Sequence, residues 1–291
     1  MQNQPLVTVI CLCYNHENFV IEALESVINQ NYNNIELIVV DDCSSDNSVE
    51  VINSWLVNHP KVRFIVNPTN LGNTKTFNKA LQLANGEYII DLAADDRLLP
   101  NCISKQIETF QNSSYEDLAI VYGNFNFINE DGSFKSIYFT ENENPVSGNG
   151  YEMVIGRTVK LGSIAAIYKT AVLKELNGYD ETLAYEDLDI WIRITRNYNI
   201  EYIDEVLAEK RELSTSLSAQ FLKRKNSKTR FLHESTLKIF DKILVLNQTK
   251  KENKAVLNRM YFELHKFKSA REWKLAFKLL IMMIKTYFKS L

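Results

Sequence analysis

The sequence predicts an α/β protein in which a mixed, mostly parallel sheet is flanked by helices and followed by a C-terminal helical appendage. Between residues 7 and 110, short apolar runs rich in Val and Ile alternate with segments of helical spacing. This rhythm is typical of parallel strands joined by right-handed crossover helices. From Leu217 onward the chain has only helical spacing and contains neither Gly nor Pro. With 291 residues, 45% of them hydrophobic, the chain can bury a large core beside such an appendage.

The first part of the chain is expected to form four parallel strands. Each is a short run of mainly apolar residues, which is typical of a strand buried on both faces. Apolar residues at helical spacing fill the gaps between them, and Pro100 suits the first turn of a fourth helix. The expected strands are Val7–Cys13, Ile35–Val40, Val62–Val66 and Tyr88–Leu92, and the expected helices cover 17–30, 51–56, 77–84 and 100–110.

Beyond residue 115 the pattern changes. Strands are expected at Ala119–Tyr122 and Asn124–Ile128, then a hairpin turn at 129–132 and a further strand at Ser136–Phe139. Two helices and a last strand are expected after a polar loop. They cover residues 169–176, 185–197 and 200–208, respectively.

Charge is unevenly distributed along the chain. Residues 1–209 carry 13 Lys and Arg against 30 Asp and Glu, whereas residues 210–291 carry 20 against 6. This asymmetry predicts a boundary near residue 210 and a basic region with an anionic partner, for which a membrane surface is the first candidate. The alternative is that the basic region folds back onto the acidic part of its own chain. Nucleic acid is not expected as a partner, because no recognition motif accompanies the basic residues.

Residues 271–291 have the pattern of an amphipathic helix. At about 100° per residue, five basic residues fall in one stripe, and apolar and aromatic residues cover much of the remainder. This pattern favours a helix at a membrane surface, and the basic run Lys223–Lys225 adds attraction. The alternative is that the apolar residues pack on the preceding helices or on a second subunit. No segment reaches the roughly 20 apolar residues that a membrane span needs.

Cysteine usage and the N-terminus indicate the compartment. The four cysteines include no Cys-x-x-Cys pair, and Cys11 and Cys13 lie within an expected buried strand. They are interpreted as small core residues in a reducing compartment. Residues 1–5 contain no basic segment and lead directly into a strand, so no signal peptide is expected.

Two pairs of aspartates carry the chemistry that the sequence predicts. Asp41 and Asp42 end the second strand, and Asp95 and Asp96 follow the fourth. Since ligands of such sheets bind beyond the carboxyl ends of the strands, both pairs are expected on one rim. Carboxylates gathered there need a ligand or a cation, which predicts a nucleotide at one pair and a divalent metal at the other. The alternative is that each pair only begins a turn.

A third acidic group opens the helix that is expected at 185–197. Glu186, Asp187 and Asp189 precede the apolar residues of this helix. A carboxylate held at a fixed position can act as a general acid or base. Acidic residues at a helix N-terminus are also stabilised by capping and by the helix dipole, and that alternative alone would explain one of the three.

Taken in order, the motifs of residues 5 to 215 resemble those of the family 2 glycosyltransferases, which have the GT-A fold. The ordered set is far more specific than any single motif. The resemblance rests on Val7–Asn15 (VTVICLCYN), Val39–Asp46 (VVDDCSSD), Asn70 and Gly72 with Asn78, Gly86–Ile89, Asp95–Asp96, and Gly178–Asp180 with Glu186–Asp187.

The resemblance implies a nucleotide site at the start of the chain. It implies that Tyr14 stacks on the nucleobase, that Leu12 contacts the base through its backbone, and that Asn15 belongs to the same site. Asp42 would accept a hydrogen bond from the base, and Asp95 would lie near the ribose. Asp96 would bind Mn²⁺ or Mg²⁺, a hard cation that neutralises the leaving diphosphate.

The resemblance also implies a catalytic base and an acceptor site. Asp187 would deprotonate the acceptor hydroxyl for a single in-line displacement that inverts the anomeric centre. Glu186 and Ser163 would contact the acceptor. The sequence departs from the family at Leu213, where many members carry a metal-binding His, so more metal ligands are expected from diphosphate and water.

These implications define an expected domain plan and activity. Residues 1–212 would form the GT-A domain, with a nucleotide-binding half at about 1–110 and an acceptor half at about 111–212, and 213–291 the basic helical region. The family's processive members carry a Gln-x-x-Arg-Trp motif that is absent here, so one sugar would be added per encounter.

The substrates and rival activities complete the prediction. The expected donor is a UDP-sugar, and the expected acceptor is a saccharide or lipid-linked saccharide of bacterial surface polysaccharide at the cytoplasmic face of the membrane. A non-catalytic nucleotide-sugar-binding protein of the same fold is the alternative. A dinucleotide oxidoreductase and a nucleotidyltransferase are disfavoured, because residues 13–17 form no Gly-rich turn.

Overall fold

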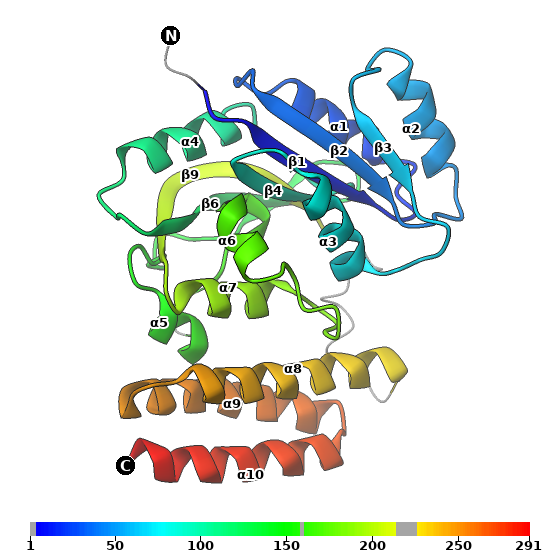
Figure 1. The fold of residues 1–291 in the computed structure, drawn as a ribbon. Coiled ribbons are helices and arrows are strands. Elements are labelled where there is room, and N and C mark those ends of the chain that lie inside the picture. The colour runs from blue at the N-terminus through cyan, green and yellow to red at the C-terminus, as the bar shows by residue number, and fades with distance from the viewer. Residues whose placement is uncertain (1–3, 158–159, 214–225) are drawn as a thin grey trace.

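The computed structural model describes residues 4–157, 160–213 and 226–291, and it confirms the predicted fold class. An α/β domain with one curved sheet lies against a layer of three long helices at the C-terminus (Figure 1). The strand order is β3-β2-β1-β4-β8-β6-β9-β5, with β7 paired to β6. The basic run Lys223–Lys225 lies outside the described residues.

The first four strands are parallel and lie close to the expected ranges. Hydrophobic alternation places Val9 and Cys11 on one face of the sheet and Ile10 on the other, in two separate buried clusters. Helices α1, α2 and α4 cover the first face, whereas α3 covers the second. The elements are β1 (Val7–Cys13), α1 (Val20–Ile28), β2 (Ile35–Asp41), α2 (Ser48–Leu56), β3 (Arg63–Val66), α3 (Asn73–Leu83) and β4 (Tyr88–Ala93).

The second half of the sheet introduces antiparallel pairing around β8, which bonds to both β4 and β6. The long strands β6 and β9 run parallel to each other. The elements are β5 (Arg97–Leu98), α4 (Cys102–Asn112), β6 (Leu118–Ile128), β7 (Phe134–Ile137), α5 (Tyr151–Gly156), the 3₁₀ turn Ser163–Ala165, β8 (Ala166–Lys169), α6 (Thr170–Glu175), α7 (Asp187–Thr195) and β9 (Asn199–Arg211).

Some sequence-based boundaries in this region were wrong. The two strands expected on either side of Gly123 are one strand, β6, whose register with β9 shifts at Gly123 and Asn124. A side chain at Gly123 would lie 2.5 Å from Leu207 Cδ1, so glycine here permits close strand contact and does not interrupt the strand. Strand β8 and helix α5 were not predicted, and Pro100 precedes α4 without entering its first turn.

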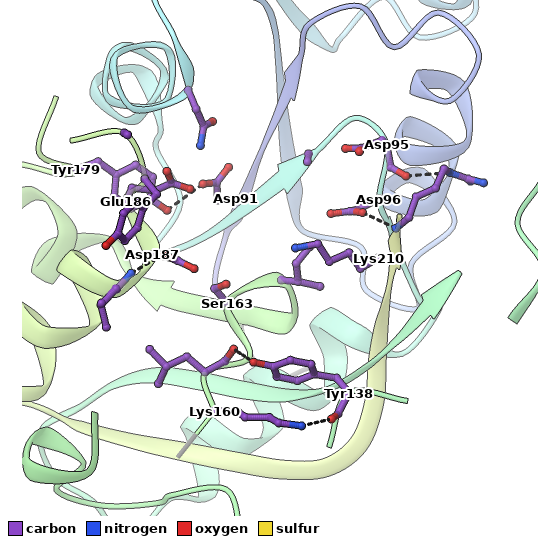
Figure 2. Close-up of a pocket in the computed structure, with 18 of the residues that line it drawn as sticks. Asp91, Asp95, Asp96, Tyr138, Lys160, Ser163, Tyr179, Glu186, Asp187 and Lys210 are labelled. Carbon is purple, nitrogen blue, oxygen red and sulfur yellow. Dashed lines mark hydrogen bonds between the residues drawn. The ribbon is translucent and has the colours of Figure 1, made fainter. Parts of the chain in front are cut away.

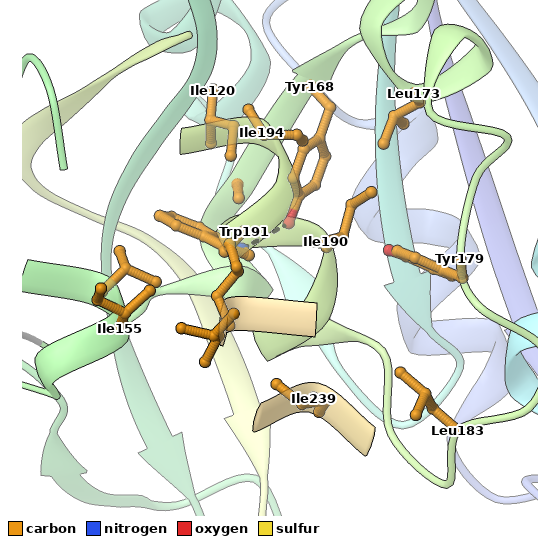
Figure 3. Packing of buried hydrophobic residues seen from close by; sticks show 14 of the residues in the cluster. Ile120, Ile155, Tyr168, Leu173, Tyr179, Leu183, Ile190, Trp191, Ile194 and Ile239 are labelled. Atoms are coloured by element: carbon orange, nitrogen blue, oxygen red, sulfur yellow. Dashed lines mark hydrogen bonds between the residues drawn. The ribbon is translucent and has the colours of Figure 1, made fainter. Parts of the chain in front are cut away.

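Helix α7 anchors the second face of the sheet. Trp191 is fully buried among Ile155, Ile194 and other apolar side chains, as Figure 3 shows. Its indole Nε1 donates a hydrogen bond to Tyr168 Oη at 3.1 Å, so the polar atom is satisfied within the core. This packing holds the N-terminus of α7 against the sheet.

The three C-terminal helices pack onto the acidic α/β domain. They are α8 (Ser227–Leu246), α9 (Lys250–Ser269), which begins with a capping box of Thr249 and Glu252, and α10 (Trp273–Ser290). Arg259 of α9 donates hydrogen bonds to the backbone oxygens of Val154 and Ile155 in α5, at 2.7 and 3.2 Å. The expected contact of the basic region with its own chain is therefore present. Among the described residues, none of the helices is both long enough and apolar enough to span a bilayer.

Candidate active site

A cavity of about 1190 Å³ opens at the carboxyl ends of β1 and β4 and extends toward α7 and α9. It lies where the crevice rule for open α/β sheets places ligands. Seven of the nine site residues predicted from the sequence line it, so the structure brings both halves of the expected site into one space. They are Leu12, Tyr14, Asp95, Asp96, Ser163, Glu186 and Asp187.

The other two predicted residues, Asn15 and Asp42, are not part of the cavity lining. Asn15 Oδ1 accepts a hydrogen bond from the backbone N of Ser45 at 2.7 Å. The carboxylate of Asp42 accepts the backbone N–H groups of Leu71 and Gly72 at 2.9 and 2.8 Å. Asp42 therefore ties the end of β2 to the loop before α3, and a contact with the base remains a prediction.

The turn interpretation applies to Asp41. Its two carboxylate oxygens accept hydrogen bonds from the backbone N and the hydroxyl of Ser44, at 2.8 and 2.6 Å. The side chain is completely buried. Asp41 therefore shapes the turn after β2, and only the second aspartate of this pair faces the loop that borders the expected nucleotide site.

Asp96 is buried at the floor of the cavity, where Oδ1 accepts the backbone N of Arg211 at 2.8 Å. Burial, together with the charge of neighbouring Asp95, raises the pKa of Asp96 well above its ordinary value. The positive charges of Lys210 and Arg211 lower the pKa of Asp96. A bound cation would also lower this pKa, because positive charge favours the ionised carboxylate.

His16, in the loop after β1, also lines the cavity. Its Nδ1 lies 3.9 Å from Asp95 Oδ1 and is buried without a hydrogen-bond partner among the described residues. A buried polar atom of this kind is normally satisfied, so a ligand or water belongs beside it.

The acidic residues around the start of α7 divide into two roles. Asp187 is exposed to the cavity, and its Oδ1 accepts the backbone N of Leu188 at 2.7 Å. Asp189 is buried and bonds to Arg193 Nε at 2.8 Å and to Lys242 Nζ at 2.6 Å. Asp189 therefore has a structural role through ion pairs, not through capping, and it joins α7 to α8.

Glu186 lies beside a carboxylate that the sequence interpretation missed. Burial in the cavity wall, with the charges of Asp187 and Asp91 nearby, raises the pKa of Glu186 to about 8. Burial likewise raises the pKa of Asp91 to about 7, although the hydroxyl of Tyr179 donates to its Oδ2 at 2.9 Å. Figure 2 shows Asp91, Tyr179 and Glu186 grouped on one side of the cavity and Asp95 with Asp96 on the other.

A signal for Asp91 exists in the sequence. It is the one acid inside the apolar run of β4, and alternation places it on the same face of the strand as Ala93, which also lines the cavity. The basic lining residues gave no such signal, because they come from segments that only the fold brings together. These are Arg157, Lys160, Lys210, Arg211, Arg259 and Lys266.

The donor set fits a divalent cation that is shared with a phosphate ligand. Among the described residues, no group of three or more His, Cys, Asp and Glu is arranged to hold a metal by itself. Mg²⁺ typically takes one or two carboxylates and completes its octahedron with substrate phosphates and water. Asp96 and Asp95 would supply such carboxylates, and Leu213, which replaces the family's histidine, also lines the cavity.

Comparison with known proteins identifies the family. The sequence model of "Glycosyl transferase family 2" matches residues 8–166, which is more than half of the chain. The chain belongs to glycosyltransferase family 2. An uncharacterized glycosyltransferase of Methanocaldococcus jannaschii is 30% identical to it over 212 residues, which cover 72% of this chain and 71% of that protein.

Two further proteins similar to this family 2 glycosyltransferase are longer than it. Chondroitin synthase of Escherichia coli is 26% identical over 71% of this chain, but the match covers only 29% of that protein. Residues 1–349 of S. aureus TarS have a TM-score of 0.68 at 18% identity, covering 98% of this chain and 80% of that one. This likeness shows that the fold is of the GT-A type.

Two of the similar structures contain nucleotide-sugars. TarS in complex with UDP-GlcNAc has a TM-score of 0.67 at 18% identity, over 98% of this chain and 79% of that chain. A mannosyltransferase of Pyrobaculum calidifontis in complex with GDP-Man and Mn²⁺ has a TM-score of 0.55 at 16% identity, over 99% and 88% of the two chains. At these identities the two matches establish only that the fold is shared.

Proposed function

We propose that this family 2 glycosyltransferase transfers a single sugar, with inversion, from a UDP-sugar to a saccharide or lipid-linked saccharide of surface polysaccharide. One observation carries the proposal: the Asp95–Asp96 pair and the Glu186–Asp187 pair face the same cavity from opposite sides. A donor diphosphate on the first pair and an acceptor hydroxyl on the second would then meet between them.

In this proposal the donor lies along the ends of β1 and β4. Tyr14, whose side chain is 46% exposed, offers a free ring face on which a nucleobase can stack. Asp95 accepts hydrogen bonds from the ribose, and Asp96 holds the divalent cation. That cation neutralises charge on the leaving diphosphate. Lys210, close to Asp96, adds a positive charge on the same side.

Asp187 is the proposed general base. It lies at the first residue of α7, on a helix fixed by buried Trp191, so its position is held by the core. Its exposed carboxylate can take the proton from an acceptor hydroxyl as oxygen attacks the anomeric carbon. Glu186, with its raised pKa, carries a proton near neutral pH and can donate a hydrogen bond to the acceptor. Ser163, which also lines the cavity, would contact the acceptor.

The choice of substrates rests on the relatives. The structural neighbours bind UDP-GlcNAc, UDP and GDP-Man, and the TarS complex with UDP-GlcNAc is the more similar in TM-score of the two nucleotide-sugar complexes compared. Chondroitin synthase, a polysaccharide-forming relative, supports a saccharide acceptor. A location at the cytoplasmic face of a membrane follows from a nucleotide-sugar donor used on a lipid-linked acceptor.

Thermal stability in the presence of ligands tests the donor site. The melting temperature is expected to rise with UDP or a UDP-sugar plus Mn²⁺, more than with the metal alone, by binding linkage. GDP-Man serves as the competing nucleotide. Absence of stabilisation by any nucleotide diphosphate would refute the donor assignment.

Donor turnover then separates an enzyme from a binding protein. Release of UDP from the stabilising donor should depend on Asp187, measured by comparing the protein with Asp187→Asn. The exposed Asp117, outside the cavity lining, gives the matched control Asp117→Asn. Donor binding without any Asp187-dependent release would support the non-catalytic alternative.

A further inference from the structure

Helix α10 packs on the rest of the protein through one face only. Leu275, Ala276, Leu279 and Thr286 are buried, and the helix lies against α9 and α8. In Figure 1 it forms the outermost layer, on the side of α9 and α8 that faces away from the sheet. These four buried residues account for the packing of α10 on the preceding helices, which the sequence analysis gave as the alternative to membrane binding.

A second apolar stripe remains exposed on the same helix. Its side chains are between 39% and 69% exposed, and at about 100° per residue they span roughly 120° opposite the buried face. Single exposed apolar residues are ordinary, but a contiguous row along five turns marks an interaction surface. The aromatic and aliphatic members that define this stripe include Trp273, Phe277, Leu280, Ile284, Tyr287 and Phe288.

Four lysines form a third stripe. Lys274, Lys278, Lys285 and Lys289 are all exposed and fall within roughly 60° of one another, directly beside the exposed apolar stripe. The sequence of α10 contains no Asp or Glu. The outer surface of the helix is therefore apolar along its centre and uniformly positive along one flank.

We propose that α10 docks on an anionic lipid bilayer, with the exposed apolar stripe in the interfacial region and the lysines at the headgroups. Interfacial helices combine these features, because aromatic side chains enter the acyl boundary while Lys stems extend to anionic lipid. A second copy of the helix is a poorer partner, since it brings four more lysines and no carboxylate to pair with them.

Docking of α10 would also place the cavity near the membrane surface. Arg259, Glu263 and Lys266 of α9 line the cavity wall, and α10 packs directly on α9. The cavity wall thus lies one helix away from the proposed bilayer contact. If sugar transfer proceeds as proposed above, the docked protein meets its acceptor at the membrane surface. The docking itself requires no donor or acceptor, so the two proposals fail separately.

Co-sedimentation of the 291-residue chain with vesicles tests the proposal. Binding to vesicles of phosphatidylcholine with 30% phosphatidylglycerol is expected to exceed binding to phosphatidylcholine alone at least tenfold and to weaken as salt rises. Phe277→Ser with Phe288→Ser should lower binding at least tenfold. The matched control is Phe134→Ser with Val57→Ser, which removes two exposed apolar side chains elsewhere.

Tryptophan fluorescence gives an independent reading of insertion. Trp55 and Trp191 are buried, whereas Trp273 is 61% exposed. A blue shift on adding anionic vesicles should therefore report Trp273 and disappear in Trp273→Phe, which still binds. Thermal melting and circular dichroism establish that the variants are folded.

Two outcomes would overturn the proposal. One is vesicle binding that is absent, or equal in the protein and the Phe277→Ser, Phe288→Ser variant. The other is a concentration-dependent dimer in sedimentation equilibrium that the same two substitutions abolish, which would assign the stripe to a second copy of the chain.

Discussion

The backbone N–H of Arg211 donates a hydrogen bond to Asp96 Oδ1 at 2.8 Å, joining the last residue of β9 to the carboxylate that follows β4. The guanidinium of Arg211 extends this link. It donates to the backbone oxygens of Asp95 and Glu130, at 3.1 and 2.6 Å, and to Glu22 Oε2 at 2.7 Å. One buried arginine thus fixes the segment that presents both aspartates to the cavity.

The proposed metal role of Asp96 predicts the effect of Asp96→Asn. The amide oxygen of Asn can still accept the Arg211 N–H, so the fold should persist. Loss of the charged oxygen ligand should weaken Mn²⁺-dependent binding of UDP at least tenfold and leave metal-free binding unchanged. Isothermal titration with and without Mn²⁺ measures this, with Asp117→Asn as control. If UDP binding depended equally on Mn²⁺ in Asp96→Asn and Asp117→Asn, Asp96 would be excluded as a metal ligand.

Arg211→Lys is expected to destabilise the protein. The Arg211 guanidinium donates hydrogen bonds to several acceptors at once. The single ammonium group of Lys cannot donate to all of these acceptors. Unsatisfied buried acceptors should lower the free energy of unfolding by about 2 kcal/mol, measured by urea denaturation. Arg230→Lys is the control, because Arg230 is exposed and pairs with Glu234 within α8. Equal stability of the two variants would argue against this positioning role.

Asp187→Asn should reduce sugar transfer about 10²- to 10⁴-fold, the usual contribution of general acid–base catalysis. The Asn oxygen can accept the Leu188 N–H, so the start of α7 should be preserved. Donor affinity should be unchanged, because the proposed nucleotide site lies on the opposite side of the cavity. Steady-state kinetics and UDP titration measure the two effects. A variant with transfer within threefold of the parent protein would remove Asp187 as the base.

The parts of the fold and site that the sequence predicted are those that depend on local pattern. Buried parallel strands are continuous apolar runs, so β1 and β4 were located within a residue. Of the two aspartate pairs expected on one rim, Asp95 and Asp96 line the cavity, whereas Asp41 and Asp42 are not part of its lining. Gly123 was misread as a break because its role depends on the distance to Leu207, a residue of β9 far away in sequence.

The roles of individual acids depended on partners that no local pattern reveals. Asp189 was grouped with Asp187, although Lys242 from α8 and Arg193 make it a buried structural carboxylate. Asp42 is expected to contact the nucleobase, and this stays a prediction; its carboxylate also accepts the backbone N–H groups of Leu71 and Gly72. Tertiary contacts thus give Asp189 a structural role that its place at the start of a helix does not reveal.

The raised pKa of Glu186 predicts how stability depends on pH. The pKa is about 8 in the folded protein, against an ordinary value of 4.5, so the folded state binds more protons between these values. The free energy of unfolding therefore falls as pH rises from 4.5 to 8. Glu186→Gln has no proton to lose at this position, so its stability should fall less over the same range.

Melting temperatures of Glu186→Gln and the parent protein test this without metal or nucleotide. The variant should gain about 7 °C relative to the parent between pH 5 and pH 8, since the linked change is about 3.5 kcal/mol at about 1.4 kcal/mol per pKa unit, and a domain of this size shifts roughly 2 °C per kcal/mol. Asp91, whose pKa is about 7, remains in both proteins, so both curves should still decline. Glu50→Gln, at an exposed site on α2, should run parallel to the parent. Parallel curves for Glu186→Gln as well would show that Glu186 is ionised at neutral pH and cannot donate a proton to an acceptor.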